Sequence, residues 1–190
     1  TLPIYVAFTS FHQELIPTAL LFSIAKAASG TPFPAVIEAF IMIITFEILK
    51  EAGVRLPKPV GQAISMVGAL VIGETAVSAG LISAPMSIAV AITAVSTYAN
   101  PAQSNVAFIL RIILLVFAGV FGGFGIVMGL MLLIVHLSSL KSFGTPYLAP
   151  YAPMRVCDLK DSIIRAPLNF MLTRPESIAR KNPRRQKYQK

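Results

Sequence analysis

Charged side chains are scarce in this sequence. They make up 13% of its 190 residues, whereas 55% of the residues are hydrophobic. Soluble globular domains carry about 25% charged residues, so this composition, with a mean hydropathy of +0.74, argues against a soluble domain. It favours instead a protein whose surface faces lipid.

Cysteine and tryptophan are also nearly missing. Cys157 is the single cysteine, and there is no tryptophan. One cysteine excludes an intrachain disulfide and a cysteine-based zinc site, and any aromatic anchor at a membrane interface must be tyrosine or phenylalanine. His12 and His136 have no carboxylate or cysteine at ligand spacing. With no convincing nucleophile either, the sequence predicts neither an enzyme nor a bound metal or cofactor.

Acidic residues are few at the C-terminal end, where basic residues accumulate. Residues 1–136 hold five basic and five acidic side chains, whereas residues 137–190 hold eleven basic and three acidic ones. Basic residues near membrane ends favour the cytoplasm, so residues 137–190 are predicted to form a cytoplasmic basic tail, disordered from about Arg174, that lies on anionic lipid. Nucleic-acid binding is the competing explanation, which we disfavour because a basic stretch after a membrane helix more often sets topology.

Long apolar runs dominate the rest of the chain. A membrane helix needs about 20 apolar residues, and by that measure residues 1–11 are the end of a truncated membrane helix and residues 12–136 a helical membrane domain. The expected segments of that domain are a short one at 15–29, a helix with Thr31 as N-cap and Pro32 at its first position that ends at Gly53, a crossing at 60–83, a short segment at 84–98, and the clearest spanning helix at 106–136.

The basic connector around Lys50, Arg55 and Lys58 is expected on the same side as the tail. Three full crossings between the two would place them on opposite sides. The 15-residue segment 84–98 is therefore predicted to be re-entrant or interfacial; a tilted short span is the alternative. The predicted fold is an all-α polytopic helical membrane protein with this re-entrant or interfacial segment and a basic C-terminal tail.

Charged residues inside the apolar runs are candidate functional residues. An ionised side chain at the centre of a membrane helix costs about 2.5 to 3.5 kcal/mol, so Glu38, Glu74 and Arg111 are candidate pore-lining or buried polar residues. Glu38 fits an interfacial or capping role equally well, and Glu74 fits a buried, protonated carboxyl or a structural pair with Arg111. The Glu47, Lys50 and Glu51 cluster is predicted to reach interfacial water near the end of its helix.

Glycines at four-residue spacing are candidate helix-packing positions. Small residues at this spacing allow membrane helices to approach closely; general tolerance of glycine in such helices is the alternative. The candidates are Gly73, Gly119, Gly123, Gly125 and Gly129.

Four longer stretches follow one another in a characteristic order. They are "PFPAVIEAFIMIITFEILKEAGVRLPKPVGQ", "VGALVIGETAVSAGLIS", "HLSSLKSFGTPYLAPYAP" and "DLKDSIIRAP". With them, the resemblance covers roughly residues 10 to 173. In this order they resemble the GerA-family spore germination proteins of A-subunit type, whose large soluble N-terminal region and complete first membrane helix this sequence does not contain. Only the membrane domain and C-terminal tail of such a protein are expected here.

The resemblance implies a subunit of a spore nutrient-germinant receptor in the inner membrane of a bacterial spore. It implies a homo-oligomer that forms a gated ion channel, with a transporter-like B subunit and a lipoprotein C subunit as partners alongside membrane lipid, and no nucleic acid. The carboxylates would favour cations. Two alternatives stay open: a non-conducting membrane scaffold of the germination complex, and a transporter protomer with a broken or re-entrant helix around residues 80 to 105.

Overall fold

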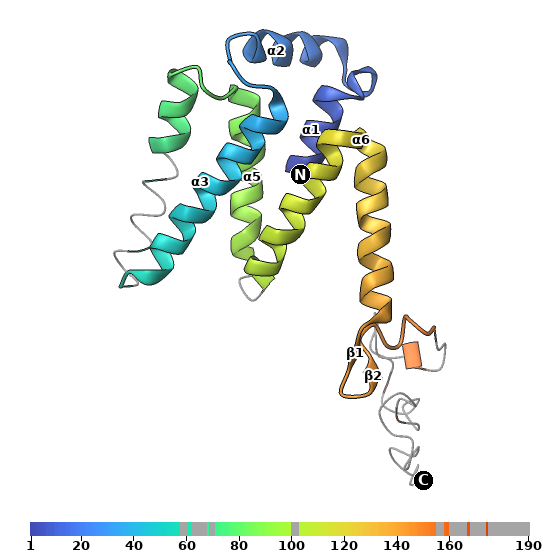
Figure 1. Cartoon of the computed structure of the whole chain (residues 1–190). Coiled ribbons are helices and arrows are strands. Elements are labelled where there is room, and N and C mark those ends of the chain that lie inside the picture. The colour runs from blue at the N-terminus through green and yellow to red at the C-terminus, as the bar shows by residue number, and fades with distance from the viewer. Residues whose placement is uncertain are drawn as a thin grey trace. The chain divides into compact units, whose positions relative to one another are not determined.

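The computed structural model describes residues 1–57, 61, 68, 71–99, 103–154, 158–159, 167 and 174, and most of these residues are helical. The elements in chain order are α1 (Leu2–Ser10), the 3-10 helix η1 (Gln13–Leu15), α2 (Thr18–Ala28), α3 (Ala35–Arg55), α5 (Ala84–Ala99), α6 (Ser104–Ser139), β1 (Lys141–Ser142) and β2 (Thr145–Pro146) (Figure 1). Residues 71–78 are also helical. The mainly helical fold expected from the sequence is confirmed.

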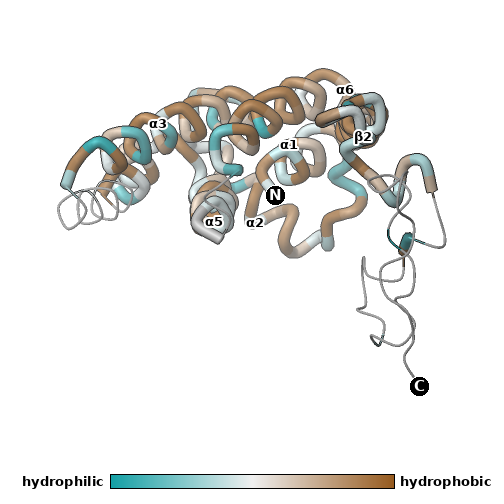
Figure 2. Tube along the Cα trace, turned by 90° about the horizontal axis from the view of Figure 1, so that it is seen from below, coloured by the Kyte–Doolittle hydropathy of each residue, from teal (hydrophilic) through white to brown (hydrophobic). Residues whose placement is uncertain are grey.

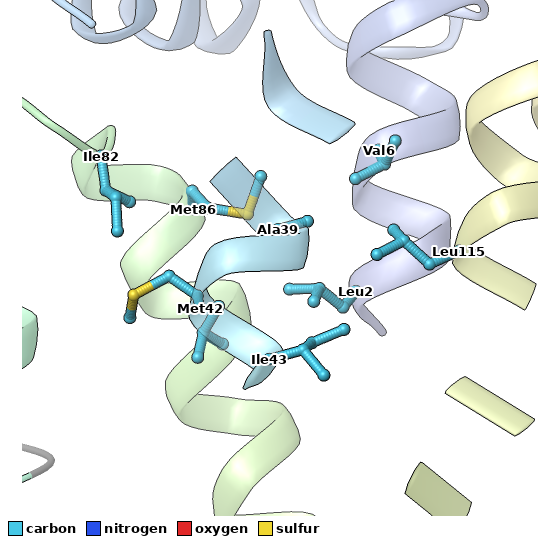
Figure 3. Packing of buried hydrophobic residues seen from close by; sticks show 9 residues of the cluster. Leu2, Val6, Ala39, Met42, Ile43, Ile82, Met86 and Leu115 are labelled. Atoms are coloured by element: carbon cyan, nitrogen blue, oxygen red, sulfur yellow. The ribbon is translucent and has the colours of Figure 1, made fainter. Parts of the chain in front are cut away.

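The chain forms two compact units, residues 1–129 and residues 130–190. In the first unit, α3 and α5 run in the same direction, and α6 begins in the opposite direction (Figure 1). Side chains from α1, α3, α5 and the start of α6 meet in one apolar core (Figure 3). Its buried members are Leu2, Val6, Ala39, Met42, Ile43, Ile82, Met86, Val90 and Leu115.

Helix α3 begins and ends later than the sequence predicts. It starts at Ala35 with Pro34 as N-cap, rather than with Thr31 as N-cap and Pro32 first. A residue that precedes proline is disfavoured in the α conformation, so Phe33 cannot readily continue a helix begun at Pro32. The helix also passes through Gly53 and ends at Arg55, because a single interior glycine costs only about 1 kcal/mol.

Helix α6 covers the segment predicted as one helix at 106–136, but it is broken within it. Gly122 has φ 63° and ψ −140°, a conformation that only glycine adopts without strain, and α6 turns sharply there (Figure 1). The chain folds back so closely that a Cβ on Gly125 would lie 2.1 Å from the carbonyl oxygen of Phe117, and one on Gly129 2.8 Å from the Leu114 side chain. The 36 residues of α6 are therefore two helical arms, 104–121 and 123–139.

Two other candidate packing glycines lie at close contacts within the first unit. A Cβ on Gly119 would lie 2.9 Å from the Val36 side chain of α3, and one on Gly123 would lie 3.0 Å from the Nε2 atom of His12. Gly73 is less crowded, since its nearest neighbour is the Ser87 hydroxyl at 3.7 Å. Within the described residues, these contacts join segments of one chain.

Large apolar side chains cover much of the described helices' outer surface. Figure 2 shows hydrophobic residues along the length of α3 and α6. Those more than half exposed on α3 and α5 are Ile48, Val54, Ile88, Ile92 and Val95. Among the described helices, α6 is long and apolar enough to cross a membrane, whereas α2 and α5 are apolar but shorter.

The second unit begins with the end of α6 and a small hairpin. Strands β1 and β2 pair antiparallel, with Lys141 opposite Pro146. Phe143 and Gly144, which join them, have φ values of 50° and 78°, as expected for a two-residue hairpin turn. This hairpin was not among the elements predicted from the sequence. The disorder predicted beyond Arg174 falls outside the described residues.

We expect Gly122→Ala to lower the free energy of unfolding by about 2 kcal/mol or more. The new Cβ requires a disfavoured backbone conformation and would lie 2.8 Å from the Cβ atom of Phe11. Thermal unfolding in detergent measures the change. Gly30→Ala is the matched control, since a Cβ there meets only the Ala27 carbonyl oxygen at 4.0 Å; equal losses in the two variants would contradict a required break at Gly122.

Candidate functional site

Glu38 is the buried carboxylate of the described core. It lies in the first turn of α3 and is 2% exposed. Its Oε2 atom accepts two hydrogen bonds from Ser83, one from the backbone N–H at 3.2 Å and one from the hydroxyl at 2.9 Å. Ser83 directly precedes α5, so this contact fixes the start of α5 against the start of α3.

The Glu38 carboxylate lies at the start of α5, where the helix stabilises a negative charge. The first N–H groups of a helix lack intrahelical acceptors, and the helix dipole stabilises a negative charge at that end. By accepting from Ser83, Glu38 caps α5 rather than its own helix α3. Of the roles considered for Glu38, the capping role therefore has direct geometric support, on a helix that its sequence neighbourhood did not identify.

A cavity of about 460 Å³ adjoins Glu38 in the first unit. Helix α2 lies across the end of α1 and the starts of α3 and α5 (Figure 1), and it supplies much of the apolar wall. The polar lining residues are Tyr5, Thr9, Ser10, Gln13, Glu38 and Ser83. The apolar lining residues are Leu21, Phe22, Ile24, Ala25, Ala28, Phe33, Pro34 and Ala35.

Glu74 lies elsewhere and is exposed. On helical residues 71–78, the exposed side chains are Val71, Glu74, Thr75 and Ser78, the spacing of a single helix face. The hydroxyls of Thr75 and Ser78 donate to carbonyl oxygens of their own helix. Glu74 forms no ion pair with any described residue, so the suggested structural pair with Arg111 is not found there.

Arg111 instead contacts α5. It is half-buried, and its guanidinium donates to the hydroxyl of Thr97 at 3.0 Å. One turn earlier on α5, the buried Thr93 forms a hydrogen bond with the side chain of Thr1. The three candidate charged residues are therefore not brought together: Glu38 borders the cavity, Glu74 lies on an exposed face, and Arg111 donates to Thr97 of α5.

The charged cluster near the end of α3 divides into two pairs. Glu51 and Arg55 form an exposed ion pair, with nitrogen and oxygen 2.8 Å apart, as expected for a solvated helix end. Glu47 and Lys50 also pair, but their side chains are only 20% and 10% exposed. The predicted access to interfacial water thus fits Glu51 and does not fit the largely covered Glu47–Lys50 pair.

The polar wall of the cavity was not predicted from the sequence. Tyr5, Thr9 and Ser10 lie in a segment interpreted only as a helix end, and Ser83 at the end of an apolar run. One local signal could have identified Ser83: a serine followed by Ala84 and Pro85 is a typical helix start. Within the described part of the chain, no group of three or more histidine, cysteine or acidic side chains could hold a metal ion.

We expect Glu38→Ala to lower the free energy of unfolding by about 1 to 3 kcal/mol, because it leaves the buried N–H and hydroxyl of Ser83 without their acceptor. Chemical denaturation in detergent measures the loss. Glu51→Ala on the same helix is the control and should cost less than about 1 kcal/mol, since its pair with Arg55 is exposed. A Glu38→Ala protein as stable as the Glu51→Ala protein would rule out the cap.

Comparison with known proteins places the chain among relatives. Residues 1–177 match the family described as Bacillus/Clostridium GerA spore germination protein. The chain is 48% identical over 185 residues to spore germination protein KA of Bacillus subtilis, covering 96% of this chain and 34% of that protein. It is 46% identical to spore germination protein GerLA of Bacillus cereus, covering 94% of this chain and 37% of that protein.

A third relative, the uncharacterized membrane protein YfkQ of Bacillus subtilis, is 48% identical over 182 residues, or 94% of this chain and 35% of that protein. The chain thus spans about a third of the length of the curated relatives it matches. No solved structure matches it significantly. On the family match over residues 1–177, this chain belongs to the GerA family of spore germination proteins.

Proposed function

We propose that the chain is part of a membrane subunit of a spore nutrient-germinant receptor, and that its copies assemble around a gated cation path that triggers germination. Relatives named as spore germination proteins, at 46 to 48% identity, support the role in germination. The exposed carboxylate on residues 71–78 supports the cation path. The Glu38 contact with Ser83 supports a structural role for Glu38.

A membrane location agrees with both the surface and a relative. One similar protein is named a membrane protein, and the outward faces of α3, α5 and α6 are rich in large apolar side chains. An exposed apolar surface of this extent in water would mark an interaction site or an aggregation hazard. In a bilayer the same surface faces lipid or neighbouring membrane helices.

The break in α6 suggests a topology with an even number of crossings. At 1.5 Å per residue, the arms 104–121 and 123–139 are each about 26 Å long, near the roughly 30 Å of a bilayer's hydrocarbon core. With the crossing predicted at 60–83, part of which lies outside the described residues, α5 and the two arms then make four crossings between the connector and the tail. In this topology α5 crosses fully, no segment need be re-entrant, and the connector and tail are both cytoplasmic.

Glu74 carries the proposal of a conducting oligomer. It lies within an apolar run, yet its side chain is exposed beside Thr75 and Ser78. Such a face in contact with lipid would cost about 2.5 to 3.5 kcal/mol for the charge alone. Water or another copy of the chain is the lower-energy neighbour, and a ring of these carboxylates around water would select cations.

The proposed assembly includes a transporter-like B subunit and a lipoprotein C subunit in the inner spore membrane, as receptors of this type would have. A non-conducting scaffold is the main alternative, in which the face with Glu74 contacts a partner subunit instead of water. A transporter protomer is the second alternative; the continuous helix α5 from Ala84 to Ala99 speaks against its broken-helix form and leaves its re-entrant form open.

We expect Glu74→Gln to reduce the cation preference of single-channel currents by about fivefold, because removing a unit charge about 4 Å from an ion in water changes its energy by about 1 kcal/mol. Currents are recorded in planar bilayers with the intact subunit and its partner subunits. Glu51→Gln is the control, since its carboxylate is solvated and paired with Arg55.

Unchanged selectivity and conductance in the Glu74→Gln channel would contradict a pore at this position. Measurements of germination and of oligomer assembly with the same variants distinguish the channel from the non-conducting scaffold. If oligomers form, no current flows in any variant, and Glu74→Gln disrupts assembly, the scaffold is the better description.

We expect Cys157 to react with a membrane-impermeant maleimide only after the cytoplasmic face is opened. It is the single cysteine of the chain, so no other thiol interferes. An Arg55→Cys protein in a Cys157→Ser background should label from the same side, because Arg55 is exposed at the end of α3. Labelling of the two positions from opposite sides would contradict the four-crossing topology.

A further inference from the structure

We propose that the cavity beneath α2 is a binding site for a small organic cation, with a protonated amine on the Glu38 carboxylate and a short aliphatic body against α2. This site is separate from the exposed face that carries Glu74. It therefore does not depend on whether the oligomer conducts ions.

The Glu38 carboxylate has one oxygen available to a ligand. Both hydrogen bonds from Ser83 reach its Oε2 atom, and Oε1 receives none from the described residues. Glu38 is 2% exposed and lines the cavity, so Oε1 has little access to bulk water. A charged acceptor in such surroundings forms a strong, short hydrogen bond with an ionised donor.

The charges of the residues that line the cavity favour a cation as its ligand. Its lining contains one carboxylate and no lysine, arginine or histidine. Tyr5, Thr9 and Ser10 contribute hydroxyl groups and Gln13 an amide, and the oxygens of these neutral groups can accept from the other two N–H bonds of a primary ammonium group. An anionic ligand would meet the Glu38 charge with no basic side chain in the lining to offset it.

The size and the apolar wall favour an organic cation over an inorganic ion. The volume of about 460 Å³ lies within the range of roughly 300 to 1,000 Å³ typical of small-molecule pockets. Leu21, Phe22 and Ile24 of α2 offer apolar contacts that a bare metal cation cannot use. An aliphatic chain of a few carbons would bury its surface there at about 0.8 kcal/mol per CH₂ group.

Isothermal titration of the purified protein in detergent micelles at pH 7 tests the site, with n-butylammonium chloride as the probe. We expect saturable binding that weakens at least tenfold in Glu38→Gln and is unchanged in the control Glu51→Gln. Because Glu38→Gln also alters the cap of α5, Ala25→Phe provides an independent test. It fills the cavity from the α2 side, leaves the Glu38–Ser83 contact in place, and should abolish binding.

Three outcomes of parallel titrations would overturn the proposal. Equal binding of 1-butanol would show an apolar cavity in which the charge of Glu38 has no role. Displacement of butylammonium by potassium chloride, beyond the effect of sodium chloride at the same ionic strength, would show an inorganic-cation site. No saturable binding of butylammonium to the unmodified protein would show that the cavity is not a ligand site.

Discussion

The contact between Glu38 and Ser83 determines how the core helices of the first unit are placed. It joins residues 45 positions apart in sequence and holds the starts of α3 and α5 together. One turn further along each helix, Met42 and Met86 are buried in the same core (Figure 3). A shift of α5 along α3 would separate Ser83 from its acceptor and would also remove these apolar side chains from their neighbours, so the polar contact and the packing specify the same register.

The same constraint explains how a carboxylate can be kept inside so apolar a chain. A buried polar group is costly unless it is hydrogen-bonded, and Glu38 offsets that cost by satisfying donors at a helix start that would otherwise be unpaired. Glu74 has no such partner in the described residues. The two glutamates therefore differ in what must surround them: Glu38 is accommodated by its own chain, whereas Glu74 requires a neighbour or water.

Local patterns in the sequence predicted the helices well and their long-range relations poorly. The bounds of α5 follow from Pro85 near its start and Pro101 beyond its end, and the family follows from long ordered motifs. The cap of α5 by Glu38 could not be predicted, because the acceptor and the donor belong to separate helices. The break at Gly122 had a visible signal, a Gly-Gly pair within an apolar run, but hydropathy alone does not distinguish one long helix from two short ones.

The turn at Gly122 also bears on how such a chain enters a membrane during synthesis. Its flanking residues are Phe121, Gly123 and Phe124, so the connection between the two arms carries no charged side chain and hardly any length. For a hairpin that spans the bilayer, insertion then requires no hydrophilic loop to be translocated. The two arms would then enter the membrane together. The insertion of the hairpin as a whole would decide on which side of the membrane the basic tail lies.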